Sequence, residues 1–162
     1  MEPRPIVHIS IPVADIDESV SYYETVLSCA VGRRTSQYAD VWFFGAQLTL
    51  VNADNRERQR HEGAGYERHF GAVVSGDRLE LLRSRVVEDA RSTIISGPTS
   101  AHVGTPLEQT KFMFRDLDGH AIELKAYTDV NAALALPARA NSQRPPCDDR
   151  IANDSLGLDV PG

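Results

Sequence analysis

Four polar residues of this 162-residue chain have the chemical types of a metal-binding site. His8, His69 and Glu123 each lie in a short segment of alternating apolar and polar residues, and so does Gln47. Two imidazoles and one carboxylate match the two-histidine, one-carboxylate ligand set of non-haem Fe(II) sites, which leaves coordination positions open. Gln47 either adds a carbonyl oxygen as a fourth ligand or only hydrogen-bonds a bound water. The residues therefore predict one divalent metal, Fe(II) by preference, with Zn, Mn, Ni, Co or Mg as alternatives.

Glu123 belongs to a hairpin that we expect over residues 111–127. Its turn is Asp118-Gly119, a pair that supplies the positive φ angles of tight hairpin connections. Apolar residues alternate along the second strand, so Glu123 points to the opposite, less apolar face. The simplest alternative to a metal ligand is a surface carboxylate paired with Lys125, a contact that is worth little free energy.

The elements that must position these residues occur twice along the chain. The first set predicts a strand, a helix and three strands at residues 6–13, 16–28, 29–35, 39–44 and 46–52. After a charged linker at 53–66, the second set predicts the same order at residues 68–75, 79–90, 92–95, 108–115 and 120–127. Residues 97–106 are expected to form a loop long enough to act as a lid or binding loop. The expected fold class is α+β, with two βαβββ modules.

The repeated order of elements suggests a structural duplication. The first helix begins seven residues after His8, and the second about eight residues after His69. If each helix covers the apolar face of its sheet, the opposite faces form a concave surface. His8, Gln47, His69 and Glu123 then occupy corresponding positions of the two modules on that surface.

Charge and composition favour a small molecule as the partner. The formal net charge of -6 and pI of about 5.3, with Lys and Arg scattered along the chain, argue against nucleic acid or an anionic membrane. Cys29 and Cys147 form neither a disulfide framework nor a zinc spacing, which fits a reducing compartment. No apolar stretch approaches membrane-spanning length and no signal peptide is evident, so we expect a cytoplasmic location.

Three motifs carry a resemblance to a known superfamily: VHISIPVADIDESVSYYETVL, RHFGAVV and DLDGHAIELKAY. Through them, roughly residues 5–128 resemble the vicinal oxygen chelate superfamily. It includes glyoxalase I, extradiol ring-cleaving dioxygenases, methylmalonyl-CoA epimerases, and fosfomycin and bleomycin resistance proteins. The resemblance implies paired βαβββ modules that form an open barrel-like cup with one metal in it. It also puts His8, His69 and Glu123 at the usual ligand positions, and Gln47 at the fourth position of glyoxalase-type members.

Two longer segments, WFFGAQLTLVN and TPLEQTKFMFRDLDGHAIELKAY, resemble a small dioxygenase-like subgroup. That subgroup tends to read FGHQ and EQ-x-T-x-F-x-x-D-P-x-G-N, and the chain departs from it at Ala46, Leu117 and His120. Our first hypothesis is therefore a metal-dependent oxygenase that resembles extradiol dioxygenases. A glyoxalase- or epimerase-like lyase or isomerase is one alternative, and a metal-free antibiotic-binding protein is another. Because members of this superfamily are frequently dimers, we expect a homodimer.

Eight residues are candidates for catalysis or substrate binding around the cup. The candidate catalytic residues are Glu108, Gln109, Lys125 and Tyr127, and the candidate substrate contacts are Ser10, Trp42, Thr49 and His102. We expect one domain over residues 1–128, with modules at about 5–52 and 67–128. The polar segment 129–162 is expected to form a short helix and then a flexible or docking tail.

Overall fold

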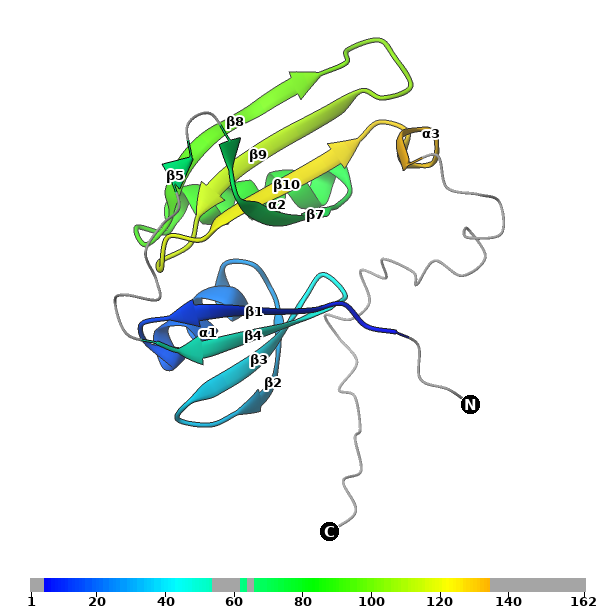
Figure 1. Ribbon diagram of the computed structural model, residues 1–162. Helices are drawn as coiled ribbons and strands as arrows, with labels where there is room; N and C mark the ends of the chain where they lie inside the picture. The colour runs from blue at the N-terminus through cyan, green and yellow to red at the C-terminus, as the bar shows by residue number, and fades with distance from the viewer. Residues whose placement is uncertain (1–4, 54–61, 64–65, 135–162) are drawn as a thin grey trace.

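The chain folds as two βαβββ modules, which Figure 1 shows in a computed structural model that describes residues 5–53, 62–63 and 66–134. The first module comprises β1 (His8–Val13), α1 (Ile16–Thr25), β2 (Ala30–Arg34), β3 (Tyr38–Phe43) and β4 (Ala46–Asn52). The second comprises β7 (His69–Val73), α2 (Gly76–Glu88), β8 (Thr93–Ala101), β9 (Gln109–Arg115) and β10 (Ala121–Tyr127). Between the modules β5 (Glu62–Gly63) pairs with β6 (Tyr66–Glu67), and α3 (Val130–Leu134) follows β10. The predicted α+β class is confirmed.

Each module holds one four-stranded sheet, and the two sheets have the same topology. The strand order is β1-β4-β3-β2 in the first sheet and β7-β10-β9-β8 in the second. In both, the first strand of the module pairs in parallel with the last, and the other pairs are antiparallel. Among the described residues no strand of one sheet pairs with a strand of the other, so the sheets do not close into a barrel.

Local sequence signals fix where these elements begin and turn. Asp15 accepts hydrogen bonds from the backbone N–H groups of Asp17 (2.8 Å) and Glu18 (2.9 Å), which satisfies the first turn of α1. Ser75 caps α2 in the same way. The predicted hairpin is observed as β9 and β10, and Gly119 has a φ of 89° in the turn between them.

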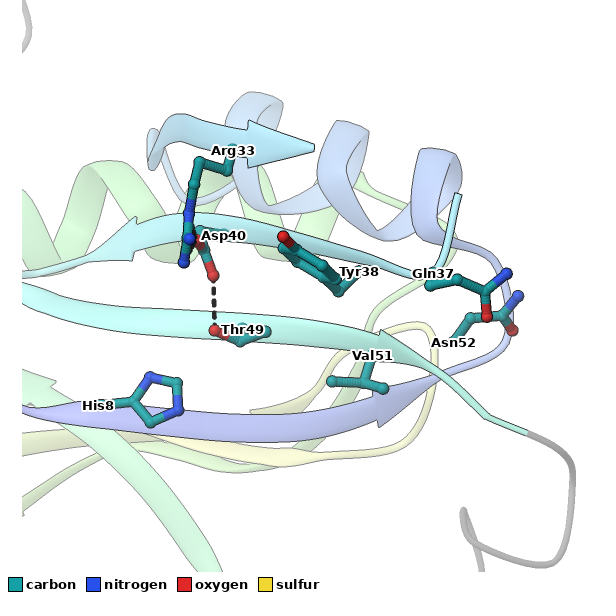
Figure 2. Close-up of a pocket in the computed structure, with 8 residues that line it drawn as sticks. All are labelled: His8, Arg33, Gln37, Tyr38, Asp40, Thr49, Val51 and Asn52. Carbon is teal, nitrogen blue, oxygen red and sulfur yellow. Dashed lines mark hydrogen bonds and ion pairs between the residues drawn. The ribbon is translucent and has the colours of Figure 1, made fainter. Parts of the chain in front are cut away.

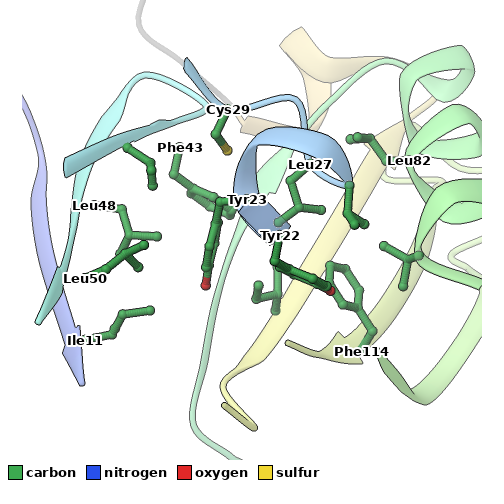
Figure 3. Packing of buried hydrophobic residues seen from close by; sticks show 14 of the residues in the cluster. Ile11, Tyr22, Tyr23, Leu27, Cys29, Phe43, Leu48, Leu50, Leu82 and Phe114 are labelled. Carbon is green, nitrogen blue, oxygen red and sulfur yellow. The ribbon is translucent and has the colours of Figure 1, made fainter. Parts of the chain in front are cut away.

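A single apolar core joins the two modules, and α1 lies at its centre. Figure 3 shows Tyr22 of α1 and Leu27, just after this helix, between Leu48 and Leu50 of the first sheet on one side and Leu82 of α2 on the other. Each of these side chains is at most 1 % exposed. The helix-covered faces of both sheets are therefore used in one shared core. The opposite face of each sheet, which we call its open face, lies outside this core.

Two carboxylates in the β9–β10 turn connect this turn to α1 and to Ala14, two residues before α1. Asp118 accepts hydrogen bonds from the Ala14 N–H at 2.8 Å and from the Ser19 hydroxyl at 2.9 Å. Asp116 accepts a hydrogen bond from the Tyr23 hydroxyl at 2.8 Å. Asp116 is only 2 % exposed, and this burial raises the pKa of its carboxyl. Contact between the modules thus depends on buried polar groups as well as on apolar packing.

The prediction of a long loop at residues 97–106 is wrong for residues 97–101, because β8 continues through Ala101. The Gly-Pro pair in this segment predicted a break in the strand. A register shift between Ser96 and Thr99 accommodates the pair, and pairing with β9 resumes at Thr99. The segment that remains outside strands is therefore too short to form the lid we expected.

Parts of two other predictions lie outside the described residues. These are residues 54–61 and 64–65 of the predicted linker and residues 135–162 of the predicted tail. Helix α3 occupies the place of the short helix expected after residue 128. In the part of the chain that the structure describes, no helix is long and apolar enough to cross a membrane.

Asp116→Asn is expected to gain stability relative to the wild type as the pH rises above about 4, the region of the unfolded carboxyl pKa. A carboxyl whose pKa is raised by folding stabilises the fold most below its unfolded pKa, and this contribution is lost as the pH rises through the folded pKa. Asparagine does not ionise in this range, so it avoids the cost of burying the charge. Urea unfolding at a series of pH values measures the difference.

The matched control is Asp77→Asn, which changes an exposed carboxylate at the start of α2. At pH 7 it should change the free energy of unfolding by no more than ~0.5 kcal/mol, as expected of a surface substitution. A flat difference between Asp116→Asn and the wild type, or a trend of the opposite sign, would contradict the role of buried Asp116.

Candidate functional site

The open face of the first module brings together five of the predicted site residues. Parallel pairing of β1 with β4 puts His8 beside Gln47 and Ser10 beside Thr49. Trp42 of β3 pairs with Gln47 from the other side and is 37 % exposed. A cavity of about 380 Å³ opens on this face (Figure 2) and is lined by His8, Arg33, Gln37, Tyr38, Asp40, Thr49, Val51 and Asn52.

Asp40 is a buried carboxylate on this open face that the sequence alone did not single out. Its side chain accepts hydrogen bonds from the Thr49 hydroxyl at 2.6 Å, the Gln47 amide nitrogen at 3.2 Å and Arg33 Nε at 2.9 Å. Burial alone would raise the pKa of Asp40, but the hydrogen bonds from Thr49 and Arg33 outweigh it and hold the pKa below its usual range. Strand alternation could have indicated it, because Asp40 and Trp42 are two residues apart and lie on the same face of β3. In the structure Asp40 pairs with Thr49 of β4.

The open face of the second module holds the other two predicted ligands. His69 Nε2 lies 3.4 Å from Glu123 Oε2, and Glu123 is 8 % exposed. Lys125 Nζ lies 2.8 Å from the same oxygen. The pairing of Glu123 with Lys125 that we weighed as the alternative to a metal ligand is therefore present, together with the contact to His69. A carboxylate this buried requires a positively charged or hydrogen-bonding partner.

Strand register sets three of the candidate catalytic residues in a row with Glu123. Lys125 and Tyr127 follow Glu123 on the same face of β10, and Gln109 of β9 pairs with Tyr127. Gln109 is 8 % exposed, and its Oε1 has no hydrogen-bond partner among the described residues. This polar row extends the second open face away from His69.

Glu108 and His102 lie away from both groups of residues. Glu108 Oε2 accepts a hydrogen bond from the Gly104 N–H at 2.7 Å, which closes the turn between β8 and β9. His102 lies in the same turn, is exposed and has a φ of 57°. The structure gives both residues a place in this turn rather than beside the predicted ligands.

The four predicted ligands thus form two pairs on two different open faces. His8 and Gln47 belong to the first module, and His69 and Glu123 to the second. Within the described part of the chain, no group of three or more His, Cys, Asp or Glu side chains is close enough to hold a metal ion. The shared core explains this separation, because it uses the helix-covered faces and leaves each open face on its own.

Comparison with known proteins identifies the fold and the family. A family model described as the Glyoxalase/Bleomycin resistance protein/Dioxygenase superfamily matches residues 5–124. A solved glyoxalase/bleomycin resistance protein/dioxygenase from Alicyclobacillus acidocaldarius is 26% identical with a TM-score of 0.63, over 81% of this chain and 97% of that chain. No curated protein matches the chain.

Two more distant structures share the fold. A genomically encoded fosfomycin resistance protein from Listeria monocytogenes is 14% identical with a TM-score of 0.62, over 82% of this chain and 99% of that chain. A glyoxalase/bleomycin resistance protein/dioxygenase family enzyme from Burkholderia phytofirmans is 12% identical with a TM-score of 0.58, over 74% of this chain and 96% of that chain. At these identities the likeness concerns the fold alone.

Gly71→Ala is expected to displace Glu123 and to destabilise the second sheet. A Cβ atom on Gly71 would lie 1.8 Å from the backbone oxygen of Glu123, so β7 and β10 must move apart. Overpacking of this kind costs about 1–3 kcal/mol or more of unfolding free energy. Denaturant unfolding measures the loss.

Gly76→Ala is the control, because a Cβ atom there meets nothing within 4 Å. It lies at the start of α2 and should be neutral or stabilising by up to ~1 kcal/mol. Equal unfolding free energies of the two variants would contradict the close approach of β7 to β10.

Proposed function

The chain belongs to the Glyoxalase/Bleomycin resistance protein/Dioxygenase superfamily, and from this membership we propose that it is a divalent-metal-dependent enzyme acting on a small molecule with two adjacent oxygen atoms. One observation carries the proposal: a pair of candidate metal ligands lies on the open face of each module. His8 is paired with Gln47, and His69 with Glu123. The pairs occupy equivalent strands of two modules with the same topology.

The chemistry of these donors fits a divalent ion. Imidazole nitrogen and carboxylate oxygen suit Fe, Zn, Ni or Mn, and an amide oxygen is an acceptable further ligand. Glu123 is buried, and a buried carboxylate requires a cationic or hydrogen-bonding partner. Lys125 is that partner in the structure, so a divalent ion would take the place of its ammonium group beside Glu123. When bound, a divalent ion supplies a Lewis acid that polarises both oxygens of a chelating substrate. Lys125, whose Nζ lies 2.8 Å from Glu123 Oε2, is our candidate for moving a proton on that substrate.

We propose that a second copy of the chain completes the site. Each open face offers one imidazole and one oxygen donor, which is half of the predicted ligand set. The first open face also leaves Trp42 and Val51 at least 36 % exposed, as expected of a surface that a partner covers. In a homodimer, His8 and Gln47 of one copy would face His69 and Glu123 of the other.

The reaction class depends on whether Gln47 is a ligand. With His8, His69 and Glu123 alone, three positions of an octahedral ion stay open, enough for both substrate oxygens and O2. This is the oxygenase that the sequence resemblance favours. With Gln47 as a fourth ligand, a chelating substrate fills the remaining positions, and a lyase or isomerase that moves protons is favoured. The contact of Gln47 with Asp40 supports the second alternative.

Metal-depleted protein is expected to bind about one divalent ion per chain when it is reconstituted anaerobically with Fe(II), Mn(II) or Zn(II). His69→Ala and Glu123→Ala should each weaken binding by about 10-fold or more, because each removes a ligand. His102→Ala is the control, since this imidazole is exposed and lies in the β8–β9 turn. Elemental analysis and calorimetric titration measure binding. Oxygen uptake by the Fe(II)-loaded protein with catechol-type substrates then tests the oxygenase.

Wild-type protein that binds no metal after reconstitution would overturn the proposed function. A metal-free binding protein would then be the better account of the open faces.

Mixing His8→Ala protein with Glu123→Ala protein, by co-expression with two tags, is expected to restore metal binding. Half of the dimers in an equal mixture are mixed, and each mixed dimer has one site free of substitutions, so about a quarter of the sites recover. Mixing His69→Ala with Glu123→Ala is the matched control, because every site then carries a defect in the same half. Recovery no greater than in this control would contradict a site shared between two copies.

A further inference from the structure

We infer that Asp40 is a positioning residue, which holds the amide of Gln47 so that its carbonyl oxygen, and not its nitrogen, is offered to the metal. This inference rests on the proposed metal site and extends it to a residue that is not itself a ligand. The inference gives the buried carboxylate of Asp40 a role in the site. If Gln47 is a ligand, fewer coordination positions of the metal remain for the substrate.

The orientation of the amide follows from the contact between the two side chains. Gln47 Nε2 lies 3.2 Å from Asp40 Oδ2. An ionised carboxylate only accepts hydrogen bonds, so the amide must turn its NH2 group toward Asp40. The reverse orientation would put the amide oxygen against a negative charge. Gln47 Oε1 therefore lies on the side of the amide away from Asp40, and Gln47 itself is the neighbour of His8 across β4 and β1.

Asp40 is itself held in place by stronger contacts than the one to Gln47. Thr49 donates to Oδ1 at 2.6 Å, Arg33 Nε donates to Oδ2 at 2.9 Å, and Arg33 Nη2 forms an ion pair with Oδ2 at 2.9 Å. Arg33 also lies over the ring of Tyr38, 5.9 Å from its centroid. Both carboxylate oxygens are occupied and the residue is 3 % exposed. Asp40 is therefore a fixed hydrogen-bond acceptor, and the amide of Gln47 orients to match it.

The consequence is a ligand set of two imidazoles, one carboxylate and one neutral amide oxygen. On an octahedral ion this set leaves two positions, which a substrate with adjacent oxygens fills by chelation. The site would then select a bidentate substrate and exclude O2 as a third exogenous ligand. Within the proposed function, this favours lyase or isomerase chemistry over oxygenation.

A double-mutant cycle with Co(II) tests the inference in the full-length protein. Asp40→Asn should weaken Co(II) binding about 10–100-fold, because its new amide no longer forces one orientation on Gln47. Gln47→Ala should weaken binding by a similar factor and change the visible d–d absorption of bound Co(II) in the same way. The double variant Asp40→Asn/Gln47→Ala should bind no more weakly than Gln47→Ala alone, because Asp40 acts only through Gln47.

Rescue separates positioning from a structural role. Asp40→Glu keeps a carboxylate that only accepts hydrogen bonds, so the Gln47 amide should keep its orientation. Co(II) affinity and spectrum should stay within about 3-fold of the wild type in this variant, in contrast to Asp40→Asn. Asp17→Asn is the matched control, because Asp17 pairs with Arg34 in the same module at an exposed position. Its Co(II) affinity should equal that of the wild type.

Unchanged Co(II) affinity and spectrum in Gln47→Ala would overturn the inference while leaving the three-ligand metal site intact. Additive losses from Asp40→Asn and Gln47→Ala would also overturn it, because Asp40 would then act on the metal by another route. Gln47→Ala keeps Asp40 with Arg33 and Thr49, so this variant tests the inference even if Asp40→Asn does not fold. Failure of the wild type to bind Co(II) would overturn the proposed function itself, and this inference with it.

Discussion

The rest of the structure depends on the way α1 is packed. This helix covers its own sheet, and it also fills the space against α2 and the β9–β10 turn of the second module. Tyr22 and Tyr23 are fully buried there, and aromatic side chains of this size contribute strongly to burial. Once both helix-covered faces are committed to one core, neither can take part in a site. The proposed site is therefore confined to the open faces, and its two candidate ligand pairs are separated within one chain.

The polar contacts in that core fix orientation more than they add stability. Asp118 binds the Ala14 N–H and the Ser19 hydroxyl, so the β9–β10 turn can meet α1 in only one register. Asp116 adds a buried charge that must be matched by the Tyr23 hydroxyl and by backbone N–H groups of its own turn. A buried carboxylate of this kind is costly when any partner is lost. The same turn leads directly into the strand of Glu123, so the register of the modules and the position of this carboxylate are coupled.

Strand alternation was enough to predict which residues share a face. It grouped His8 with Ser10 and separated Glu123 from its apolar neighbours, and the Asp118-Gly119 pair identified the hairpin, all of which depend on local geometry. It did not predict Asp40 as a partner of Gln47, because that contact depends on the register between β3 and β4. It also mistook the Gly-Pro pair of β8 for a loop, since a bulge inside a paired strand leaves the same local signature. The placement of two ligand pairs on separate open faces depends on tertiary packing of the helices, which no local pattern encodes.

Under the proposed function, Lys125 and a divalent ion compete for Glu123 on the second open face. Lys125 neutralises it at 2.8 Å, but this lysine side chain is 30% exposed and ends on a flexible four-carbon stem. A divalent ion carries twice the charge and can bind His69 Nε2 as well, which lies 3.4 Å from the same carboxylate oxygen. A lone ammonium in the same position satisfies the carboxylate but leaves the ligand pair of the opposing open face unused. The ion therefore gains most when both pairs are present, and metal binding and association of two copies should stabilise each other.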